Sequence, residues 1–186
     1  MKIYTKTGDS GETGILGSRL SKNSALIQTI GDIDELNSTV GICLSVMDSG
    51  KNQELKQGKK FLLNIQSTLF SINSILANAN LEIDLDREIN NLEEKIDEMS
   101  ESLEELKNFI LPGGSLVSSS LHFARTVCRR AERNLVNYLE NDNKDLNEFC
   151  LILKYINRLS DYLFTLARWT NSIEGNKDIV WKIRKK

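Results

Sequence analysis

The segment 121–138, LHFARTVCRRAERNLVNY, shows most clearly how this chain folds. Its apolar residues recur at alternating steps of three and four, which is the spacing of one face of an amphipathic α-helix. The residues of this apolar stripe are Leu121, Ala124, Cys128, Ala131, Leu135 and Tyr138. The segment therefore predicts a helix that packs one face against a core.

The same spacing occurs in other segments, which begin near Leu26, Leu62, Ile89 and Phe149. The stripe that starts at Ile89 continues to Leu106, which predicts a helix of that length. A single proline in the chain agrees with a mostly helical structure. Five stripes separated by short polar breaks predict an all-α fold, a five-helix antiparallel bundle of ferritin-like architecture.

Composition and length limit the other possibilities. The 186 residues suffice for a single domain, 1–186, made of a Gly-rich N-terminal loop segment (1–24), a helix bundle (25–172) and a C-terminal tail (173–186). The net charge of −2 gives no general attraction to nucleic acid or to an anionic membrane. No apolar run is long enough to span a bilayer, and the N-terminus lacks a secretory signal, so we expect a cytoplasmic protein.

The cysteines give no sign of a disulfide framework or of a metal site. Cys43, Cys128 and Cys150 are widely spaced, and none belongs to a CxxC pair. Each lies within an apolar helical pattern, so we expect buried thiols in a reducing compartment. No protein-only metal site is predicted.

The N-terminal segment 5–14, TKTGDSGETG, does not resemble part of a helix bundle. Its glycines let backbone amides approach an anion closely, and its hydroxyls and Lys6 add donors, as do Arg19 and Lys22 further on. Such a loop suits a polyphosphate, although it lacks the GxxxxGK[ST] pattern of a P-loop. A flexible Gly-rich N-terminus explains the composition equally well.

A second irregular segment is FILPGGS, residues 109–115. Proline followed by two glycines ends one helix, and Ser115 is a suitable N-cap for the next. The segment is either a connection whose apolar residues cover the core or an apolar wall at the mouth of a ligand pocket.

A third feature is the group of arginines on the helix at 121–138. At about 100° per residue, Arg125, Arg129 and Glu132 lie within about 60° of one another, and Arg133 borders the same face. Glu132 and Arg129 could form a surface pair, but the excess of positive charge suits an anionic ligand. The single histidine, His122, is expected to be a hydrogen-bonded packing residue.

Five segments, in this order, resemble the PduO-type cobalamin adenosyltransferases. They are KIYTKTGDSGET (2–13), GDIDELNS (31–38), FILPGGS (109–115), LHFARTVCRRAER (121–133) and YINRLSDYLFTLAR (155–168). The resemblance implies an enzyme that transfers the 5′-deoxyadenosyl group of ATP to the cobalt of cob(I)alamin and releases triphosphate. It also implies a homotrimer with active sites between neighbouring subunits, and Mg²⁺ bound with ATP.

The resemblance further implies roles for individual residues. The residues expected to bind ATP are Thr5, Lys6, Thr7, Gly8, Thr13, Gly14, Lys22, Arg129, Arg130, Glu132, Arg133 and Asn157. The residues expected to be catalytic are Phe109, Arg125, Arg129 and Asp34. Among these, Asp34 and Arg125 resemble a pair joined across the subunit interface, and Phe109 resembles the aromatic residue that displaces the lower axial ligand of the corrinoid. The stretch from Gly17 to Lys22 is one residue shorter than the family pattern.

The predicted reaction is consistent with what the sequence lacks. Cob(I)alamin is a strong nucleophile, so its attack on C5′ of ATP needs positioning and charge stabilisation rather than a Ser–His pair. No flavin or iron–sulfur motif is visible, so a separate reductase is expected, and an adenosylcobalamin-dependent enzyme is a further possible partner. A non-catalytic escort for adenosylcobalamin and a helical interaction module are the alternatives.

Overall fold

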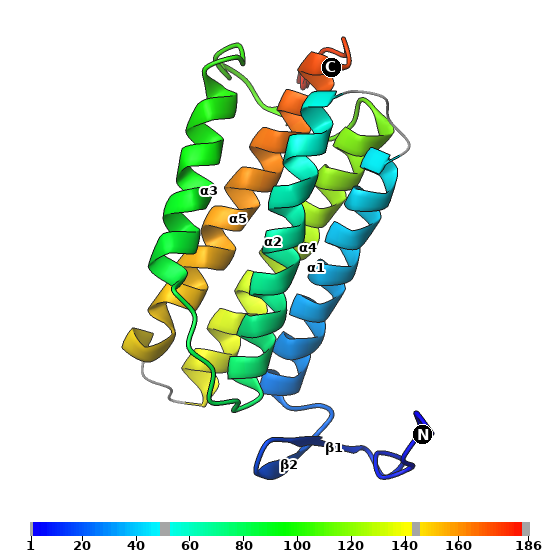
Figure 1. The fold of residues 1–186 in the computed structure, drawn as a ribbon, viewed down its shortest axis with the longest axis vertical. Coiled ribbons are helices and arrows are strands. Elements are labelled where there is room, and N and C mark those ends of the chain that lie inside the picture. Colours follow the sequence, from blue (N-terminus) through cyan, green and yellow to red (C-terminus); the bar gives the residue numbers. More distant parts are fainter. Residues whose placement is uncertain (1, 49–52, 143–145, 184–186) are drawn as a thin grey trace.

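Helices make up most of the chain in the computed structural model, which describes residues 2–48, 53–142 and 146–183 (Figure 1). The helices are α1 (Ala25–Asp48), α2 (Gln53–Leu76), α3 (Leu85–Ser100), α4 (Leu116–Asn141) and α5 (Leu146–Ile173). Two small antiparallel strand pairs complete the described part: β1 (Glu12–Ile15) and β2 (Ser18–Ser21) form a hairpin, and β3 (Ile110–Leu111) pairs with β4 (Ile179–Val180), which follows α5.

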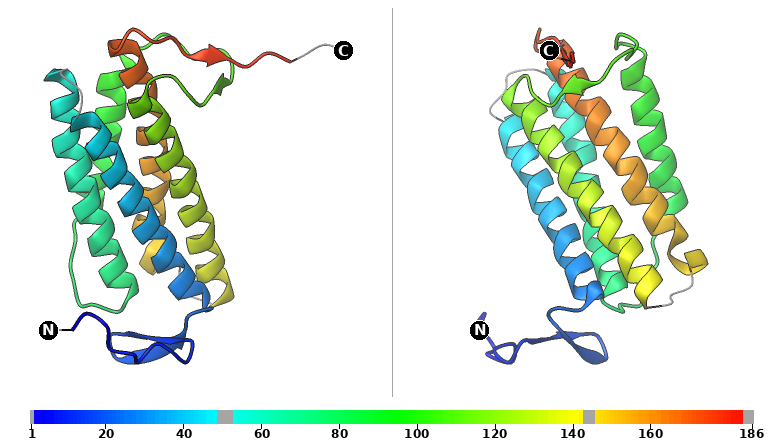
Figure 2. Two further views of the ribbon diagram at one scale, coloured as in Figure 1. Left: turned by 90° about the vertical axis from the view of Figure 1, so that its right-hand side faces the viewer. Right: turned by 180° about the vertical axis from the view of Figure 1, so that it is seen from behind.

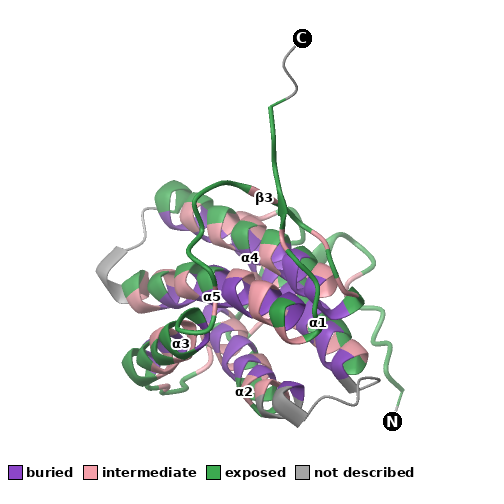
Figure 3. Cartoon of the chain, turned by 90° about the horizontal axis from the view of Figure 1, so that it is seen from above, coloured by how far each residue is buried: buried purple, intermediate pink, exposed green. Residues whose placement is uncertain are grey.

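The helices form a bundle in which α4 lies between α1 and α5. On the outer sides, α2 packs against α1, and α3 packs against α5 and runs in the same direction as α5 (Figure 1). Seen from above, the buried residues of the helices face one another across the bundle (Figure 3). The predicted all-α bundle is therefore confirmed.

The apolar stripe predicted at 121–138 forms the part of the core that α4 contributes. Its six members are all buried, and five of them are completely inaccessible to solvent. Helix α4 begins where the sequence predicts, because the Ser115 side chain accepts a hydrogen bond of 3.1 Å from the amide of Ser118. Both the start of this helix and the face that it buries thus follow from local sequence.

The third helix ends earlier than predicted. Helix α3 stops at Ser100, and Leu103 and Leu106 lie in a loop rather than on a helix that continues to Leu106. The loop turns over the end of α5, where the Arg168 guanidinium binds the carbonyl oxygen of Glu104 at 2.9 Å. A contact with a distant helix has replaced the local helical hydrogen bonds.

The cysteines are free thiols, and two of the three are buried as predicted. Burial raises the pKa of Cys43 to about 12, so this thiol stays protonated near neutral pH. The prediction is wrong for Cys150, which is exposed. Cys150 lies about 200° around α5 from the buried Ile152, on the solvent side of that helix.

The N-terminal hairpin was not predicted as strands. Its two-residue turn, Leu16-Gly17, has Gly17 at φ +84°, a conformation that glycine adopts without steric cost. Strands of four residues are too short to show a clear alternation of apolar and polar side chains. None of the helices that the structure describes is both long enough and apolar enough to cross a bilayer.

Candidate active site

Arg129 lies on the outer face of α4, and its side chain is exposed. In the part of the chain that the structure describes, its guanidinium has no ion-pair partner within 4 Å. Arg133, one turn further along, is also exposed and donates to the main-chain oxygen of Arg129 at 2.9 Å. This face therefore presents positive charge that is available to an anion.

Glu132 does not pair with Arg129, which was the alternative considered from the sequence. Its Oε1 instead accepts a hydrogen bond of 2.7 Å from Nδ2 of Asn157 on α5. Two of the residues predicted to bind ATP are thus brought together from segments 25 residues apart in the chain. The second carboxylate oxygen of Glu132 is left for another ligand.

Arg125 lies about one turn from Arg129, toward the start of α4, with its guanidinium carbon 6.0 Å from the ring centre of Phe164. Its Nε is buried and has no hydrogen-bond partner among the described residues. Burial and then the neighbouring Arg129 lower the pKa of Arg125. Asp34, its predicted partner, is exposed on α1 and is not paired with Arg125 within the same chain.

Arg130, also predicted to bind ATP, lies on the side of α4 that faces α1. Its Nε donates to Oδ1 of Asp32 at 3.3 Å, and its Nη2 bonds to Glu35. The hydrogen bond that Arg130 donates to Glu35 is the main cause of the raised pKa of Arg130. Asp32 is buried and also accepts from Nδ2 of Asn134 at 2.5 Å. In this chain Arg130 therefore joins α4 to α1, and its contact with ATP stays a prediction.

Sequence reasoning missed Asp32, although a signal was present. Asp32 follows Thr29 by three residues and precedes Leu36 by four, so it lies on the same buried face of α1. A carboxylate on such a face needs partners from a neighbouring helix, which Arg130 and Asn134 supply.

The N-terminal loop closes on itself. The Lys22 Nζ donates to the carbonyl oxygen of Gly8 at 2.8 Å, and the hydroxyls of Thr5 and Thr7 are 2.9 Å apart. A Cβ at position 8 would lie 3.2 Å from the Lys22 Nζ, so this close approach favours glycine. Lys6 has φ +61°, an uncommon backbone conformation for a lysine.

Two further predicted ATP ligands lie on the N-terminal hairpin itself. Thr13 and Gly14 belong to β1 and pair with Leu20 and Arg19 of β2. Arg19 also binds the carbonyl oxygen of Thr7 at 2.6 Å, so the hairpin and the loop form one unit.

This N-terminal unit is attached to the end of α2. The amide of Leu16 donates to the carbonyl oxygen of Ala77 at 3.1 Å, and Nδ2 of Asn78 donates to the carbonyl oxygen of Leu16 at 3.2 Å. The unit lies at the opposite end of the bundle from the segment 101–115, which contains Phe109 (Figure 2). Because α4 alone is about 39 Å long at 1.5 Å per residue, the loop and Phe109 do not meet within one chain.

Phe109 lies at the other end of the bundle and is 81% exposed. Its main-chain oxygen accepts a hydrogen bond of 2.8 Å from the amide of Trp181, next to the β3–β4 pair. Leu116 and Phe123 lie seven residues apart on one face of α4, and both are exposed as well. The segment 109–115 is thus a connection that leaves an aromatic side chain uncovered, which favours an apolar wall over the alternative of a segment that covers the core.

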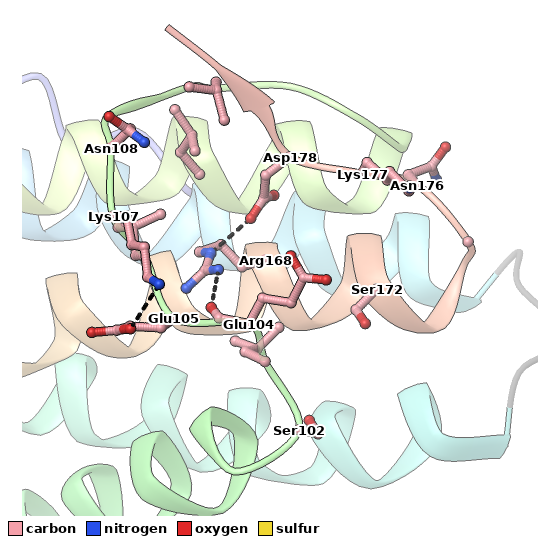
Figure 4. Close-up of a pocket in the computed structure, with 15 residues that line it drawn as sticks. Ser102, Glu104, Glu105, Lys107, Asn108, Arg168, Ser172, Asn176, Lys177 and Asp178 are labelled. Carbon is pink, nitrogen blue, oxygen red and sulfur yellow. Dashed lines mark hydrogen bonds and ion pairs between the residues drawn. The ribbon is translucent and has the colours of Figure 1, made fainter.

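A cavity of about 550 Å³ lies behind this connection, between residues 102–110 and the tail 175–180 (Figure 4). Arg168 projects into it from α5 and binds Oδ2 of Asp178 at 2.7 Å. Helical periodicity could not predict this cavity, because the tail carries no helical stripe.

His122 is buried, with 3% of its surface exposed, and its ring lies edge-on to Phe164 with 5.9 Å between ring centres. The predicted packing role is confirmed, but the predicted hydrogen bond is wrong, since neither ring nitrogen has a partner in the described structure. Burial, followed by the charge of Arg125, lowers the pKa of His122.

Comparison with known protein families shows which family has this combination of features. The family model described as cobalamin adenosyltransferase matches residues 3–170. This chain belongs to that family. The match covers the N-terminal loop, the arginine face of α4 and the segment that carries Phe109, and it ends shortly before the tail that forms β4.

Individual members of the cobalamin adenosyltransferase family agree along nearly the whole chain. The corrinoid adenosyltransferase of Bacillus subtilis is 40% identical, over 98% of this chain and 93% of that protein. The human corrinoid adenosyltransferase MMAB is 39% identical, over 97% of this chain and 73% of that protein.

Solved structures agree equally well with this chain. A variant PduO-type ATP:corrinoid adenosyltransferase from Lactobacillus reuteri, complexed with cobalamin and ATP, has a TM-score of 0.88 at 37% identity and covers 99% of this chain and 98% of its own. A second variant of that enzyme, complexed with ATP, has a TM-score of 0.87 at 38% identity. The match covers 97% of this chain and 100% of the chain of that enzyme.

Proposed function

We propose that this protein transfers the 5′-deoxyadenosyl group of ATP to the cobalt of cob(I)alamin, giving adenosylcobalamin and triphosphate. The observation that carries the proposal is the exposed guanidinium of Arg129, which has no ion-pair partner among the described residues, beside the Glu132–Asn157 hydrogen bond. Membership of the adenosyltransferase family supports it, as do similar structures complexed with cobalamin and ATP.

The transfer of the adenosyl group requires stabilisation of negative charge on the leaving triphosphate rather than proton transfer. The Co(I) electron pair forms a bond to C5′, the bond from C5′ to the phosphate oxygen breaks, and triphosphate leaves with that bond's electrons. No proton has to move, so no general base is required. The catalytic demands are alignment of C5′ with cobalt and neutralisation of the negative charge on the leaving group.

Exposed cationic side chains occur in both segments that we expect to bind the phosphates of ATP, the N-terminal loop and α4. Lys6 and Lys22 belong to the N-terminal loop, and Arg129 and Arg133 belong to α4. The glycines of the loop would let backbone amides add donors to the same phosphates, as in other anion-binding loops. The predicted contact between ATP and Arg130 requires this arginine to keep or exchange its bonds with Asp32 and Glu35.

The residues present fit Mg²⁺ that arrives with ATP. No group of three or more His, Cys, Asp or Glu side chains suited to a metal ion occurs among the described residues. Mg²⁺ is commonly held by substrate phosphates, water and one or two carboxylates. Glu132, with one oxygen oriented by Asn157, is the carboxylate that we expect to contribute. The ion would supply positive charge against the phosphate oxygens.

We further propose that the active site forms between copies of this chain, in a homotrimer. Nε of Arg125 is buried and has no hydrogen-bond partner in the described ranges of the chain, while Asp34 is exposed. The N-terminal loop and Phe109 lie at opposite ends of the bundle (Figure 2). A neighbouring copy would supply Asp34 to Arg125 and would place its own loop beside the α4 arginines.

Phe109 is proposed to lie against the corrin in place of the lower axial ligand. Its exposure of 81% makes the side chain available to a large flat ligand. An apolar surface there would keep water and nitrogen ligands away from cobalt and so ease reduction of Co(II). A separate reductase would supply the electron, in the cytoplasm, and an adenosylcobalamin-dependent enzyme would receive the product.

An anaerobic assay with cob(I)alamin and MgATP tests the proposal. We expect loss of the Co(I) absorbance together with stoichiometric release of triphosphate and formation of a light-sensitive adenosylcorrinoid. Binding of both ligands without turnover would instead establish the escort alternative. Sedimentation of the same preparation would test the trimer, and a monomer with full activity would contradict the proposed interfacial site.

A further inference from the structure

The segment 101–115, here called the Phe109 segment, depends on distant residues for its position. It contains no helix, and its only regular structure is the two-residue strand β3. Arg168 of α5 holds its first part, with Nη2 2.9 Å from the carbonyl oxygen of Glu104. The same guanidinium donates through Nε to Oδ2 of Asp178 at 2.7 Å.

Asn171, less than one turn further along α5, holds the last part of the segment. Its Nδ2 donates to the carbonyl oxygen of Gly113 at 3.0 Å, and its Oδ1 accepts from the amide of Ser115 at 3.0 Å. Its Nδ2 also lies 3.4 Å from Oδ1 of Asp178. Asn171 is 2% exposed, so solvent does not compete for these bonds.

Asp178 is therefore the acceptor that the two anchoring side chains share, one at each carboxylate oxygen. Its ion pair with Arg168 is largely removed from water, with side chains 12% exposed for Arg168 and 19% for Asp178. Figure 4 shows the Arg168 guanidinium between Asp178 and the main chain at Glu104. We call Arg168, Asn171 and Asp178 the latch.

The latch acts next to the strand that touches Phe109. Asp178 immediately precedes β4, and β4 pairs with β3 through Ile110 opposite Val180 and Leu111 opposite Ile179. The following residue, Trp181, donates its amide to the carbonyl oxygen of Phe109 at 2.8 Å. Fixing Asp178 thus fixes the strand that holds the main chain at Phe109 and at the two residues that follow it.

We infer that Asp178, held by Arg168 and Asn171, is a positioning residue that sets where Phe109 meets the corrinoid. The inference rests on the proposed role of Phe109. The core of the bundle does not depend on the latch, because the buried apolar residues of α1 to α5 end at Ala167 and Asp178 lies beyond the last helix. Removing the charge of Asp178 should therefore release the Phe109 segment while the helices remain folded.

The test is Asp178→Asn with three comparisons: Asp178→Glu, Phe109→Ala, and the double variant Phe109→Ala/Asp178→Asn. Glu93→Gln is the matched control, since Glu93 also binds an α5 arginine, Arg158, at 2.9 Å but far from Phe109. Turnover is measured with MgATP, starting from cob(II)alamin with a reductant and from chemically reduced cob(I)alamin. Helical circular dichroism checks that each variant is folded.

For Asp178→Asn we expect about a tenfold or larger loss of turnover from cob(II)alamin, a smaller loss from cob(I)alamin and an unchanged KM for ATP. Asp178→Glu should recover most of the activity, and Glu93→Gln should behave as the parent. In the Phe109→Ala background the Asp178→Asn substitution should have little further effect, because both changes act through the same side chain. Equal losses from both corrinoids, or fully additive losses, would overturn the inference.

A second readout does not depend on activity. The chain has two tryptophans, Trp169 and Trp181. In a Trp169→Phe background the emission reports on Trp181 alone, and Asp178→Asn should increase its quenching by acrylamide. Unchanged quenching would show that Asp178 does not hold the strand. If Phe109→Ala has no selective effect on cob(II)alamin, the proposed role of Phe109 fails, and the quenching still decides whether the latch exists.

Discussion

Asn157 on α5 donates a hydrogen bond of 2.7 Å to Glu132 on α4, so the two helices are joined at the face that carries Arg129. The bond fixes one carboxylate oxygen of Glu132 and leaves the other free. A negative group held this way beside exposed arginines is well placed to orient Mg²⁺ and to keep the arginines in position.

Replacing Glu132 with alanine should therefore impair catalysis more than stability. We expect kcat/KM for MgATP to fall about tenfold or more, because the metal-bound phosphates lose an orienting carboxylate. The unfolding free energy should fall by only about 1 kcal/mol, the contribution of one partly exposed hydrogen bond. Steady-state kinetics and thermal unfolding measure the two effects. Asn141→Ala, an exposed residue of the same helix about 180° around from Glu132, should change neither.

Arg129→Ala should abolish ATP turnover and leave the helical signal intact. The guanidinium has no ion-pair partner among the described residues, so the protein does not need it for folding. Loss of a cation that faces the departing triphosphate should cost at least about a hundredfold in turnover, which leaves almost no activity. Arg87→Ala, an exposed arginine on α3, is the control. Near-normal turnover of Arg129→Ala would remove this residue from the active site.

Asp32→Ala should destabilise the packing of α1 on α4. The substitution removes the acceptor that Arg130 and Asn134 share, at a position that is 3% exposed, and leaves Arg130 with Glu35 alone. We expect a loss of about 2 kcal/mol, below the range for fully buried pairs because Arg130 is partly solvated. Denaturant unfolding measures this loss. The exposed Asp97 on α3 provides the control substitution, and an equal effect of Asp97→Ala would count against the buried network.

Gly114→Ala and Gly113→Ala should differ sharply although they are neighbours. Gly114 has φ +108°, and a Cβ there would lie 2.1 Å from Oδ1 of Asn171. We expect Gly114→Ala to cost about 2 kcal/mol or more and to lower turnover, since it displaces the segment next to Phe109. A Cβ at Gly113 meets nothing within 4 Å, so Gly113→Ala should be tolerated. Similar unfolding midpoints for the two variants would contradict this account.

His122 should make stability depend on pH in the acid range. Burial and then Arg125 hold its pKa below the ordinary value of 6.5. The unfolded chain therefore binds a proton before the folded protein does, and stability falls as the pH drops below about 6.5 toward the lower folded pKa. Urea unfolding at several pH values should show this fall, and it should be smaller by up to about 1.4 kcal/mol per pH unit in His122→Phe. Parallel curves for the two proteins would mean that His122 does not titrate in this range.

Local spacing explains why parts of the structure could be predicted from the sequence. The stripe from Leu121 to Tyr138 identifies the buried face of α4, and Ser115 marks its start. The same spacing places Arg129 and Glu132 on one accessible face. These features depend only on residues within a few turns of one another, and helical periodicity reports them directly.

Features that depend on distant partners could not be predicted in this way. Arg130 follows the same local pattern as Arg129, yet it binds Asp32, 98 residues earlier in the chain. The early end of α3 and the position of β4 depend on Arg168, which no local pattern connects with Glu104 or Asp178. Likewise, His122 has helical spacing typical of the core, but only the packed structure shows that its nitrogens lack partners.

The exposed aromatic side chain of Phe109 has a thermodynamic consequence for ligand binding. Phe109 faces water in this structure, as do the large apolar residues Leu116, Phe123 and Trp181. Covering such a surface removes ordered hydration, and the heat capacity of the system falls as a result. Corrinoid binding should thus become steadily more exothermic as temperature rises. The steepness of that change, followed by calorimetry, measures how much of the aromatic surface the corrin covers.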